Sequence, residues 1–288
     1  MILAFVGWLM TVRKISTSSI SQYLSGLRVV HLKSGVLPGN LRPDLVQAIL
    51  KGHSNCEAPS KAPRLAMTIP VMKLFKRLLK MSNIMHEKKR LLWAISCIAF
   101  HGSFRIHELL SKEEQSFDHT TTLLGADVRL LITTVDGQSE EILSVHLKNP
   151  KEDKLRLGVN VELFATGTFS CPVAAWKKWR QAAKGTLSMT KPVFRLGTGK
   201  CLTGAKFNSE LKNILGKFID YDKKKFLSHS FRAGFASMMA AAGYSDQEIM
   251  RQGRWHSQAF AAYCKTGRGS RLKKQREMIK KNSMTFTM

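Results

Sequence analysis

Between residues 105 and 263 the chain carries five dispersed side chains of types that can act on a phosphodiester. In chain order they are an arginine, a lysine, a histidine three residues before a second arginine, and a tyrosine: Arg105, Lys148, His229, Arg232 and Tyr263. A guanidinium is a planar fork that matches phosphate oxygens. Amines and imidazoles transfer protons. A phenol can act as a nucleophile where cationic neighbours ease the loss of its proton.

Each of these residues alone also permits a plainer interpretation. Arg105 can pair with Glu108, three residues on, as readily as it can face a cleft. A lone His-x-x-Arg recurs by chance, but His229 and Arg232 open an expected helix, whose free N–H groups attract phosphate. Tyr263 alone is equally well explained as a half-buried aromatic side chain.

Two positions offer alternatives for further parts of such a site. Trp255 lies eight residues before Tyr263 and is followed by His256. A lone tryptophan is more often packed in a core, although its indole N–H can donate to a bound phosphate. Lys148 lies at an expected β-hairpin, with Lys151 as its nearest alternative.

The charge of the chain points to a polyanionic partner. Lys and Arg number 46 against 20 Asp and Glu, a net charge of +26 with a pI of about 10.2. A protein this basic repels itself unless a polyanion neutralises it, and the candidates are DNA, RNA and an anionic membrane surface. We favour nucleic acid. The apolar runs Met1–Met10 and Leu91–Phe100 are too short to predict a membrane segment.

The five cysteines are dispersed and form no Cys-x-x-Cys pair. A cysteine zinc site or a disulfide framework is therefore not expected. This usage is typical of reduced thiols in an intracellular protein.

The first part of the chain, residues 1–60, predicts a small helical domain. Ser16–Ser19 can cap a helix whose apolar stripe is Ile20, Tyr23, Leu24, Leu27 and Val30. The first helix, within Met1–Met10, is expected to be truncated at its start. Exposed basic side chains are expected to contact DNA: Arg13, Lys14, Arg28 and Lys33. His53–Met67 has two prolines and no apolar period, which predicts a linker.

Residues 61–288 predict a larger domain in which helices flank a short run of strands. The expected helices are Val71–Lys80, Lys88–Phe100, Val173–Ala183, Gly204–Ile219, Ser230–Ala242 and Asp246–Gln252. The expected strands are Val128–Val135, Ile142–Leu147 and Leu155–Leu163, and Asp136-Gly137 is a strong hairpin-turn signal. The predicted fold class is mainly α with a small antiparallel β-sheet (α+β).

The ordered set of residues resembles the catalytic domain of the tyrosine recombinase (phage integrase) family over roughly residues 68–268. The joint pattern is far more specific than any of its parts. Several segments are closest to recombinases of eukaryotic mobile elements, such as tyrosine-recombinase retrotransposons and Cryptons: FRIHELL, HLKNPKED, CPVAAWKKW, SHSFRAGFAS and GRWHS. The segment ISQYLSGLRVVHLKSG resembles the DNA-clamping core-binding domain of that family.

The resemblance implies a role for each residue. Arg105 and Arg232 would clamp the phosphate, and Tyr263 would be the nucleophile that forms a 3′-phosphotyrosyl link. The remaining roles are Lys148 as general acid (alternatively Lys151), His229 in acid–base catalysis, and Trp255 (alternatively His256) at the His-or-Trp position. The spacing from Trp255 to Tyr263 is one residue shorter than in many bacterial members.

The resemblance also implies partners. The expected substrate is double-stranded DNA, bound by a homotetramer on two duplexes, with no metal, cofactor, membrane or small-molecule substrate. The tail after Tyr263 would dock on a neighbouring protomer, and the alternatives for its basic segment Arg268–Lys281 are a solvated basic tail or a nuclear import signal. In a eukaryotic host the protein would be nuclear. It would take part in DNA integration and transposition.

Three other functions compete with this hypothesis. The first is a catalytically silent DNA-binding protein domesticated from a mobile-element recombinase. The second is a type IB topoisomerase, which shares the chemistry but relaxes DNA as a monomer. The third is a basic RNA-binding protein, although no RNA-reading motif is visible.

Overall fold

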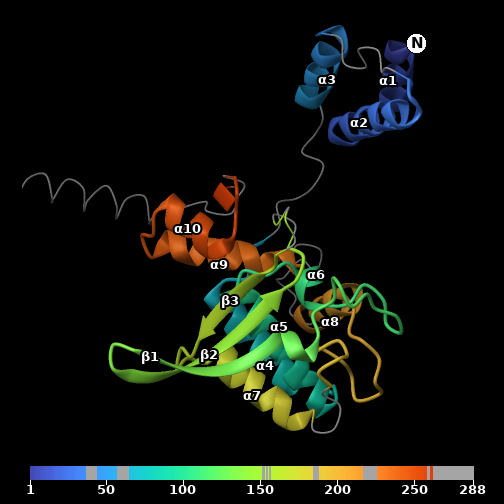
Figure 1. The fold of residues 1–288 in the computed structure, drawn as a ribbon. Coiled ribbons are helices and arrows are strands. Elements are labelled where there is room, and N and C mark those ends of the chain that lie inside the picture. Colours follow the sequence, from blue (N-terminus) through green and yellow to red (C-terminus); the bar gives the residue numbers. More distant parts are fainter. Residues whose placement is uncertain are drawn as a thin grey trace, which may run out of the picture. The chain divides into compact units, whose positions relative to one another are not determined.

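The computed structural model of the protein describes residues 1–36, 44–56, 65–150, 153, 155, 157–183, 188–216, 226–257 and 260–261. The chain divides into two compact units, Met1–Pro63 and Arg64–Met288, each of which is described by itself (Figure 1). Within the described residues, no helix is both long and apolar enough to cross a membrane.

Unit 1 consists of α1 (Ile2–Thr11), α2 (Thr17–Lys33) and α3 (Asp44–Cys56). Ser16 caps α2 as predicted, because its hydroxyl accepts a hydrogen bond from the Ser19 backbone N–H at 3.4 Å. The core is small: Val6, Leu9, Ile20, Leu24, Val46 and Leu50. Among the described residues of unit 1, α1 and α3 pack against one side of α2, so the predicted inward positions of Tyr23 and Val30 were wrong. These side chains are 49% and 57% exposed.

The predicted linker His53–Met67 was too long at both ends. At its start, α3 continues through Cys56, and the His53 ring lies 2.9 Å from the Thr17 hydroxyl. At its end, Met67 is fully buried in the core of unit 2, and its backbone N–H donates to the Ser230 carbonyl at 2.8 Å. Met67 follows a segment of small residues and prolines without an apolar period, so the sequence pattern did not indicate that Met67 is buried.

Unit 2 is built around a buried helix, α5 (His86–His101), whose inward positions are among the most buried of the chain. It packs against α7 (Pro172–Ala182), α9 (His229–Ala241) and α4 (Ile69–Met81) (Figure 1). α4 begins after Thr68 with Pro70 in its first turn, two residues before the predicted start at Val71. Because α5 is held from several sides, its last residues have a fixed position.

The sheet has three antiparallel strands in the order β1-β2-β3: β1 (Val128–Val135), β2 (Gln138–Leu147) and β3 (Val159–Phe164). Asp136 and Gly137 have φ of 49° and 78°, the left-handed conformation that a tight hairpin turn requires. β3 starts later than predicted, since the Asp153 carboxylate accepts from the N–H groups of Leu155 and Gly158 and holds a turn there. The predicted fold class, mainly α with a small antiparallel sheet, is confirmed.

Four further elements of unit 2 lie among the described residues. They are α6 (Ile106–Leu109), the 3-10 helix η1 (Gly125–Asp127), α8 (Gly204–Leu215) and α10 (Asp246–Gly253). Ser245 and Glu248 form a reciprocal capping box at the start of α10, which fixes where that helix begins.

Gly234 allows α9 to approach the chain at Met67. A Cβ atom at this position would lie 2.2 Å from the Met67 carbonyl oxygen and 3.0 Å from the Phe100 ring. We expect Gly234→Ala to lower the free energy of unfolding of unit 2 by about 1–3 kcal/mol, because the backbone must shift. Urea denaturation followed by fluorescence measures the change.

Gly26→Ala is the matched control, because nothing lies within 4 Å of the corresponding Cβ in α2. The gain in helix propensity should stabilise unit 1 by about 0.5–1 kcal/mol. If Gly234→Ala left unit 2 as stable as the parent, the close approach of α9 to Met67 would be wrong.

Candidate functional site

The turn Gly102–Arg105 joins the end of α5 to α6 and is the centre of the candidate site. The Gly102 N–H donates to Ile98 and the Phe104 N–H to Ala99, at 2.9 and 3.0 Å. Ser103 between them has φ of 48°, which is uncommon for a residue other than glycine. Phe104 is fully buried. The turn therefore presents two consecutive carbonyl groups in a fixed direction.

Two arginines from later parts of the chain bind these carbonyl groups. Arg232, in the first turns of α9, donates to the Ser103 oxygen and is 5% exposed. Arg254, directly after α10, donates to the Gly102 oxygen at 3.0 Å, and its guanidinium lies 4.7 Å from the centre of the Phe104 ring. The backbone of Arg254 is left-handed, with φ of 54°. Residues more than 120 positions apart thus converge on one turn.

Glu108 joins Arg254 to Arg105. Its buried carboxylate accepts from the Arg105 backbone N–H at 2.8 Å, from the Arg105 guanidinium at 3.0 Å and from the Arg254 guanidinium at 3.1 Å. The plainer interpretation of Arg105, an ion pair with Glu108, is therefore correct. It is not the whole account, because the guanidiniums of Arg105 and Arg254 share this one carboxylate and the cluster keeps an excess of positive charge.

Trp255 covers Arg232. The Arg232 guanidinium lies 4.3 Å from the centre of the Trp255 ring. The centre of the Phe260 ring lies 5.9 Å from the centre of the same Trp255 ring. Such cation–π contact limits where the guanidinium can point. His256 is exposed. Of the two candidates for the His-or-Trp position, Trp255 is the one that contacts a site arginine.

His229 is the first residue of α9, three residues before Arg232, and its side chain is exposed. The two residues lie on the same face at the start of one helix. The prediction that His229 and Arg232 lie in the first turn of a helix is confirmed, and the structure adds that His229 is exposed whereas Arg232 is buried.

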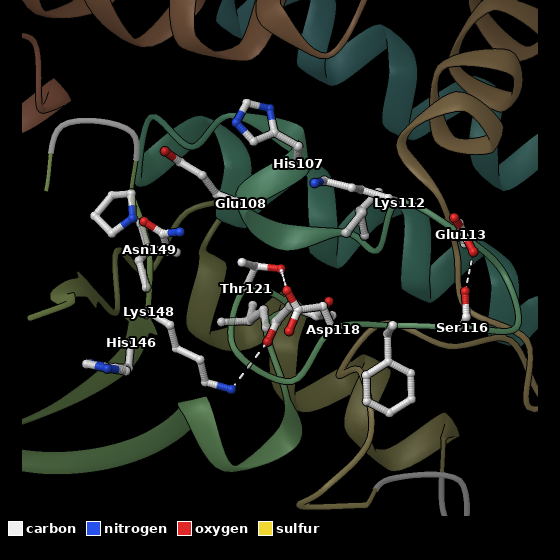
Figure 2. Close-up of a pocket in the computed structure, with 16 residues that line it drawn as sticks. His107, Glu108, Lys112, Glu113, Ser116, Asp118, Thr121, His146, Lys148 and Asn149 are labelled. Atoms are coloured by element: carbon white, nitrogen blue, oxygen red, sulfur yellow. Dashed lines mark hydrogen bonds between the residues drawn. The ribbon is translucent and has the colours of Figure 1, made fainter. Parts of the chain in front are cut away.

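Lys148 follows β2, and its ammonium is engaged away from the guanidiniums. It forms an ion pair with Asp127 at 2.8 Å and donates to the carbonyls of His119 and Thr122 at 3.0 and 3.3 Å. Lys148 and Glu108 both line a hollow of about 470 Å³ (Figure 2). Across this hollow, α6 faces the end of β2.

Several predicted site residues lie outside the described residues: Tyr263, Lys151 and the basic segment Arg268–Lys281. The predicted DNA contacts of unit 1, Arg13, Lys14, Arg28 and Lys33, are all exposed on that unit.

Arg254 was not predicted as a site residue, and Glu108 was predicted only as an alternative partner of Arg105. One feature of the sequence could have indicated Arg254: it directly precedes Trp255, and Trp255 contacts Arg232. Asp127 was not predicted either. It directly precedes β1, whereas its partner Lys148 directly follows β2, so the two residues meet only when the strands pair.

Among the described residues no group of three or more His, Cys, Asp or Glu side chains could hold a metal ion. The four cysteines in this part of the chain are free thiols.

Comparisons with known proteins identify the fold. No protein-family model matches the sequence, and no curated protein matches it. Among solved structures, the XerH site-specific recombinase bound to its palindromic difH substrate is 14% identical with a TM-score of 0.61, covering 97% of this chain and 72% of that chain. The Tn1549 transposon integrase in complex with transposon right-end DNA is 13% identical with a TM-score of 0.58, covering 96% and 85%. The chain therefore has the fold of the tyrosine recombinases and integrases.

We expect Glu108 and Arg254 to be energetically coupled. Glu108→Gln leaves two partly buried guanidiniums without their carboxylate, and should lower the free energy of unfolding by about 2–4 kcal/mol. Arg254→Gln should cost less, and the double variant should cost less than the sum of the single ones by about 1–3 kcal/mol. Chemical denaturation of the four proteins measures this coupling.

Lys206 and Glu114 provide the control pair, an exposed ion pair with an Nζ–O distance of 2.7 Å. Its coupling should stay below about 1 kcal/mol. A Glu108–Arg254 coupling no larger than that of the control pair would contradict the arrangement described here.

His101, the last residue of α5, makes stability depend on pH. Burial lowers the pKa of His101 below its ordinary value, and a hydrogen bond to Ser170 offsets part of the effect. The unfolded chain then binds more protons than the folded one near pH 6.5, so stability is lost as pH falls through that value. We expect His101→Gln to flatten this part of the profile in urea titrations between pH 8 and pH 5.5. An unchanged slope in His101→Gln would assign the loss to other groups.

Proposed function

We propose that this protein is a tyrosine recombinase, which cleaves and rejoins duplex DNA through a 3′-phosphotyrosyl intermediate without a metal or cofactor. The observation that carries the proposal is the convergence of Arg105, Arg232 and Trp255 near one turn. The fold adds support, because the XerH and Tn1549 neighbours are DNA complexes of a recombinase and an integrase.

The arginines would bind the scissile phosphate. A phosphodiester resists nucleophiles because it is negatively charged, and charge on its non-bridging oxygens grows in the transition state. Preorganised guanidiniums of Arg105 and Arg232 neutralise that charge. Removing one such donor typically costs about 2.7–4 kcal/mol, or 10²–10³ in rate.

Tyr263 would supply the nucleophile. Its oxygen attacks phosphorus, the bond to the 5′ oxygen breaks, and the phenolic proton passes to His229 or water. A 5′-hydroxyl leaves, and the phosphodiester energy is kept in the phosphotyrosyl bond. Attack by a 5′-hydroxyl from the same or another strand reverses the step, so religation needs no ATP.

A lysine would protonate the leaving oxygen, which is worth typically 10²–10⁴-fold. Lys148 lines the same hollow as Glu108, which supports its candidacy. To act as the acid, Lys148 would have to leave its ion pair with Asp127 and approach the leaving oxygen. Lys151 remains the alternative, three residues on.

The wider proposal follows the resemblance in sequence. Unit 1 would clamp DNA with Arg13, Lys14, Arg28 and Lys33. Four protomers would assemble on two duplexes, with the basic segment Arg268–Lys281 docking on a neighbouring protomer. The protein would serve integration and transposition of a eukaryotic mobile element, in the nucleus.

The alternative is a catalytically silent DNA-binding protein. The observation that favours it is the ammonium of Lys148, which is held by Asp127 and two carbonyls rather than directed to the arginines.

Covalent trapping separates the two functions. The probe is a pool of nicked suicide duplexes with a randomised central segment, on which cleavage releases a short strand and leaves the protein attached. We expect an adduct with the parent protein, no adduct with Tyr263→Phe, and rates about 10²–10³-fold lower with Arg105→Ala or Arg232→Ala.

Arg129→Ala is the control, since Arg129 is exposed on β1 outside the proposed site. Duplex binding by a protein that forms no Tyr263-dependent adduct would support the silent alternative.

The same substrate with sulfur in place of the bridging 5′ oxygen identifies the general acid. A thiolate is a far weaker base than an alkoxide, so its departure needs no proton donor. Rates lost in Lys148→Met should return on the sulfur substrate. If the sulfur substrate restored the rate of Lys151→Met and not that of Lys148→Met, Lys151 would be the general acid.

A further inference from the structure

Two helices of unit 2, α4 and α7, carry many cations and few counter-charges. On α4 they recur three and four residues apart, all exposed and on the opposite side from the buried stripe of that helix: Lys73, Lys76, Arg77 and Lys80. α7 adds Lys177, Lys178 and Arg180, and neither helix contains an Asp or Glu. Among the described residues, Lys177 with Glu141 is the one ion pair that these seven side chains form.

Backbone contacts join the cations of α4 and α7 through the start of α5. The Lys89 ammonium donates to the Lys80 carbonyl at 2.9 Å, and the Arg90 guanidinium donates to the Lys178 carbonyl at 3.1 Å. These contacts hold positive groups close to the exposed side chains of Lys80 and Lys178. We call this set the basic surface: Lys73, Lys76, Arg77, Lys80, Lys89, Arg90, Lys178 and Arg180.

Part of the basic surface is held in place by aromatic rings. The Lys76 ammonium lies 5.2 Å from the centre of the Trp93 ring and 5.7 Å from that of Phe169, and it donates to the Phe169 carbonyl at 3.0 Å. Lys73 lies 5.6 Å from the Phe169 ring. These lysines are therefore more ordered than ordinary solvated side chains, and a ligand that binds them loses less conformational entropy on their side.

The end of the basic surface at Lys89 and Arg90 is separate from the arginine cluster. Lys89 and Arg90 lie at the start of α5, whereas Gly102 follows its end. Twelve residues of helix separate Arg90 from Gly102, which is about 18 Å at 1.5 Å per residue. Since the screening length at physiological salt is about 8 Å, Lys89 and Arg90 are too far away to stabilise a phosphate at the arginine cluster.

The chemistry of the basic surface fits a nucleic acid better than a protein or a membrane. Lysine is depleted from protein–protein interfaces, whereas protein–DNA interfaces are strongly positive and polar. A row of exposed cations along a helix can follow a phosphate backbone, and each contact releases counterions.

We propose that the basic surface binds a second DNA duplex, distinct from the duplex at the arginine cluster. One protomer would then hold two DNA segments on separated faces. The proposal goes beyond the cleavage chemistry, which requires cations only at the scissile phosphate.

The test uses the full chain with Tyr263→Phe, so that no covalent link forms. Biotinylated duplex on beads captures the protein, and a fluorescent second duplex is then added at physiological salt. The readout is the amount of second duplex retained per retained protein. The variant is Arg77→Gln with Lys80→Gln and Lys178→Gln, whose side chains are exposed.

The matched control removes the same charge elsewhere on unit 2: Arg129→Gln with Lys191→Gln and Lys200→Gln, all exposed. We expect the basic-surface variant to lose about tenfold or more of the second duplex at unchanged protein capture, and the control to lose less than about twofold. Three lost phosphate contacts should also lower the salt-dependence slope of second-duplex binding by about 2.7.

Three results would overturn the proposal. If the basic-surface variant and the control retained equal amounts of second duplex, the two duplexes would be held together by contacts between protomers and not by the basic surface. A parallel loss of protein capture would make the basic surface part of the first duplex footprint. Anionic phosphatidylserine vesicles that bind the parent but not the variant, with no competition by duplex, would assign the surface to a membrane.

The outcomes separate this proposal from the proposed function. A parent protein that binds one duplex and retains no second one contradicts the basic-surface proposal alone. Bridging by a protein that forms no adduct in the covalent trapping assay contradicts only the recombinase. Failure to bind any duplex contradicts both.

Discussion

The two carbonyl groups of Gly102 and Ser103 are the constraint on which the candidate site depends. They accept from guanidiniums that enter from α9 and from the end of α10, so they set the position of Arg232 and Arg254. The turn itself is fixed by packing. A Cβ on Gly102 would lie 2.1 Å from the Phe104 ring, and α5 is buried on several sides. The geometry of a polar site thus follows from the apolar packing of one helix.

Glu108 explains how so much positive charge can be gathered in a partly buried place. Guanidiniums in a low dielectric repel one another and lose hydration unless an anion compensates them. One carboxylate between Arg105 and Arg254 offsets part of that cost and leaves a positive excess. That excess is of the size that a phosphodiester, with one charge in its ground state and more in the transition state, can use.

The sequence predicted most elements and only part of the site, for a physical reason. Patterns local to one element were reliable: the Asp136-Gly137 turn, the Ser16 cap and the apolar period of α5 all concern neighbours along the chain. Features that depend on long-range packing were not. Arg254 belongs to the site because it donates to the Gly102 carbonyl, which is 152 positions away in the sequence. Tyr23, predicted inward from its spacing, is exposed because the described helices α1 and α3 pack against the other side of α2.

The positive charge of the chain is divided among separate regions with different physical roles. At the arginine cluster the guanidiniums are partly buried and held by carbonyls, Glu108 and Trp255, so added salt screens them little. On α4 and α7 the cations are mostly exposed, so their proposed binding to a polyanion would act through counterion release, which is strongly salt-dependent. The two proposals therefore predict different responses to ionic strength for DNA capture and for the chemistry on its phosphate. The division follows from burial, since the same residue types serve in both places.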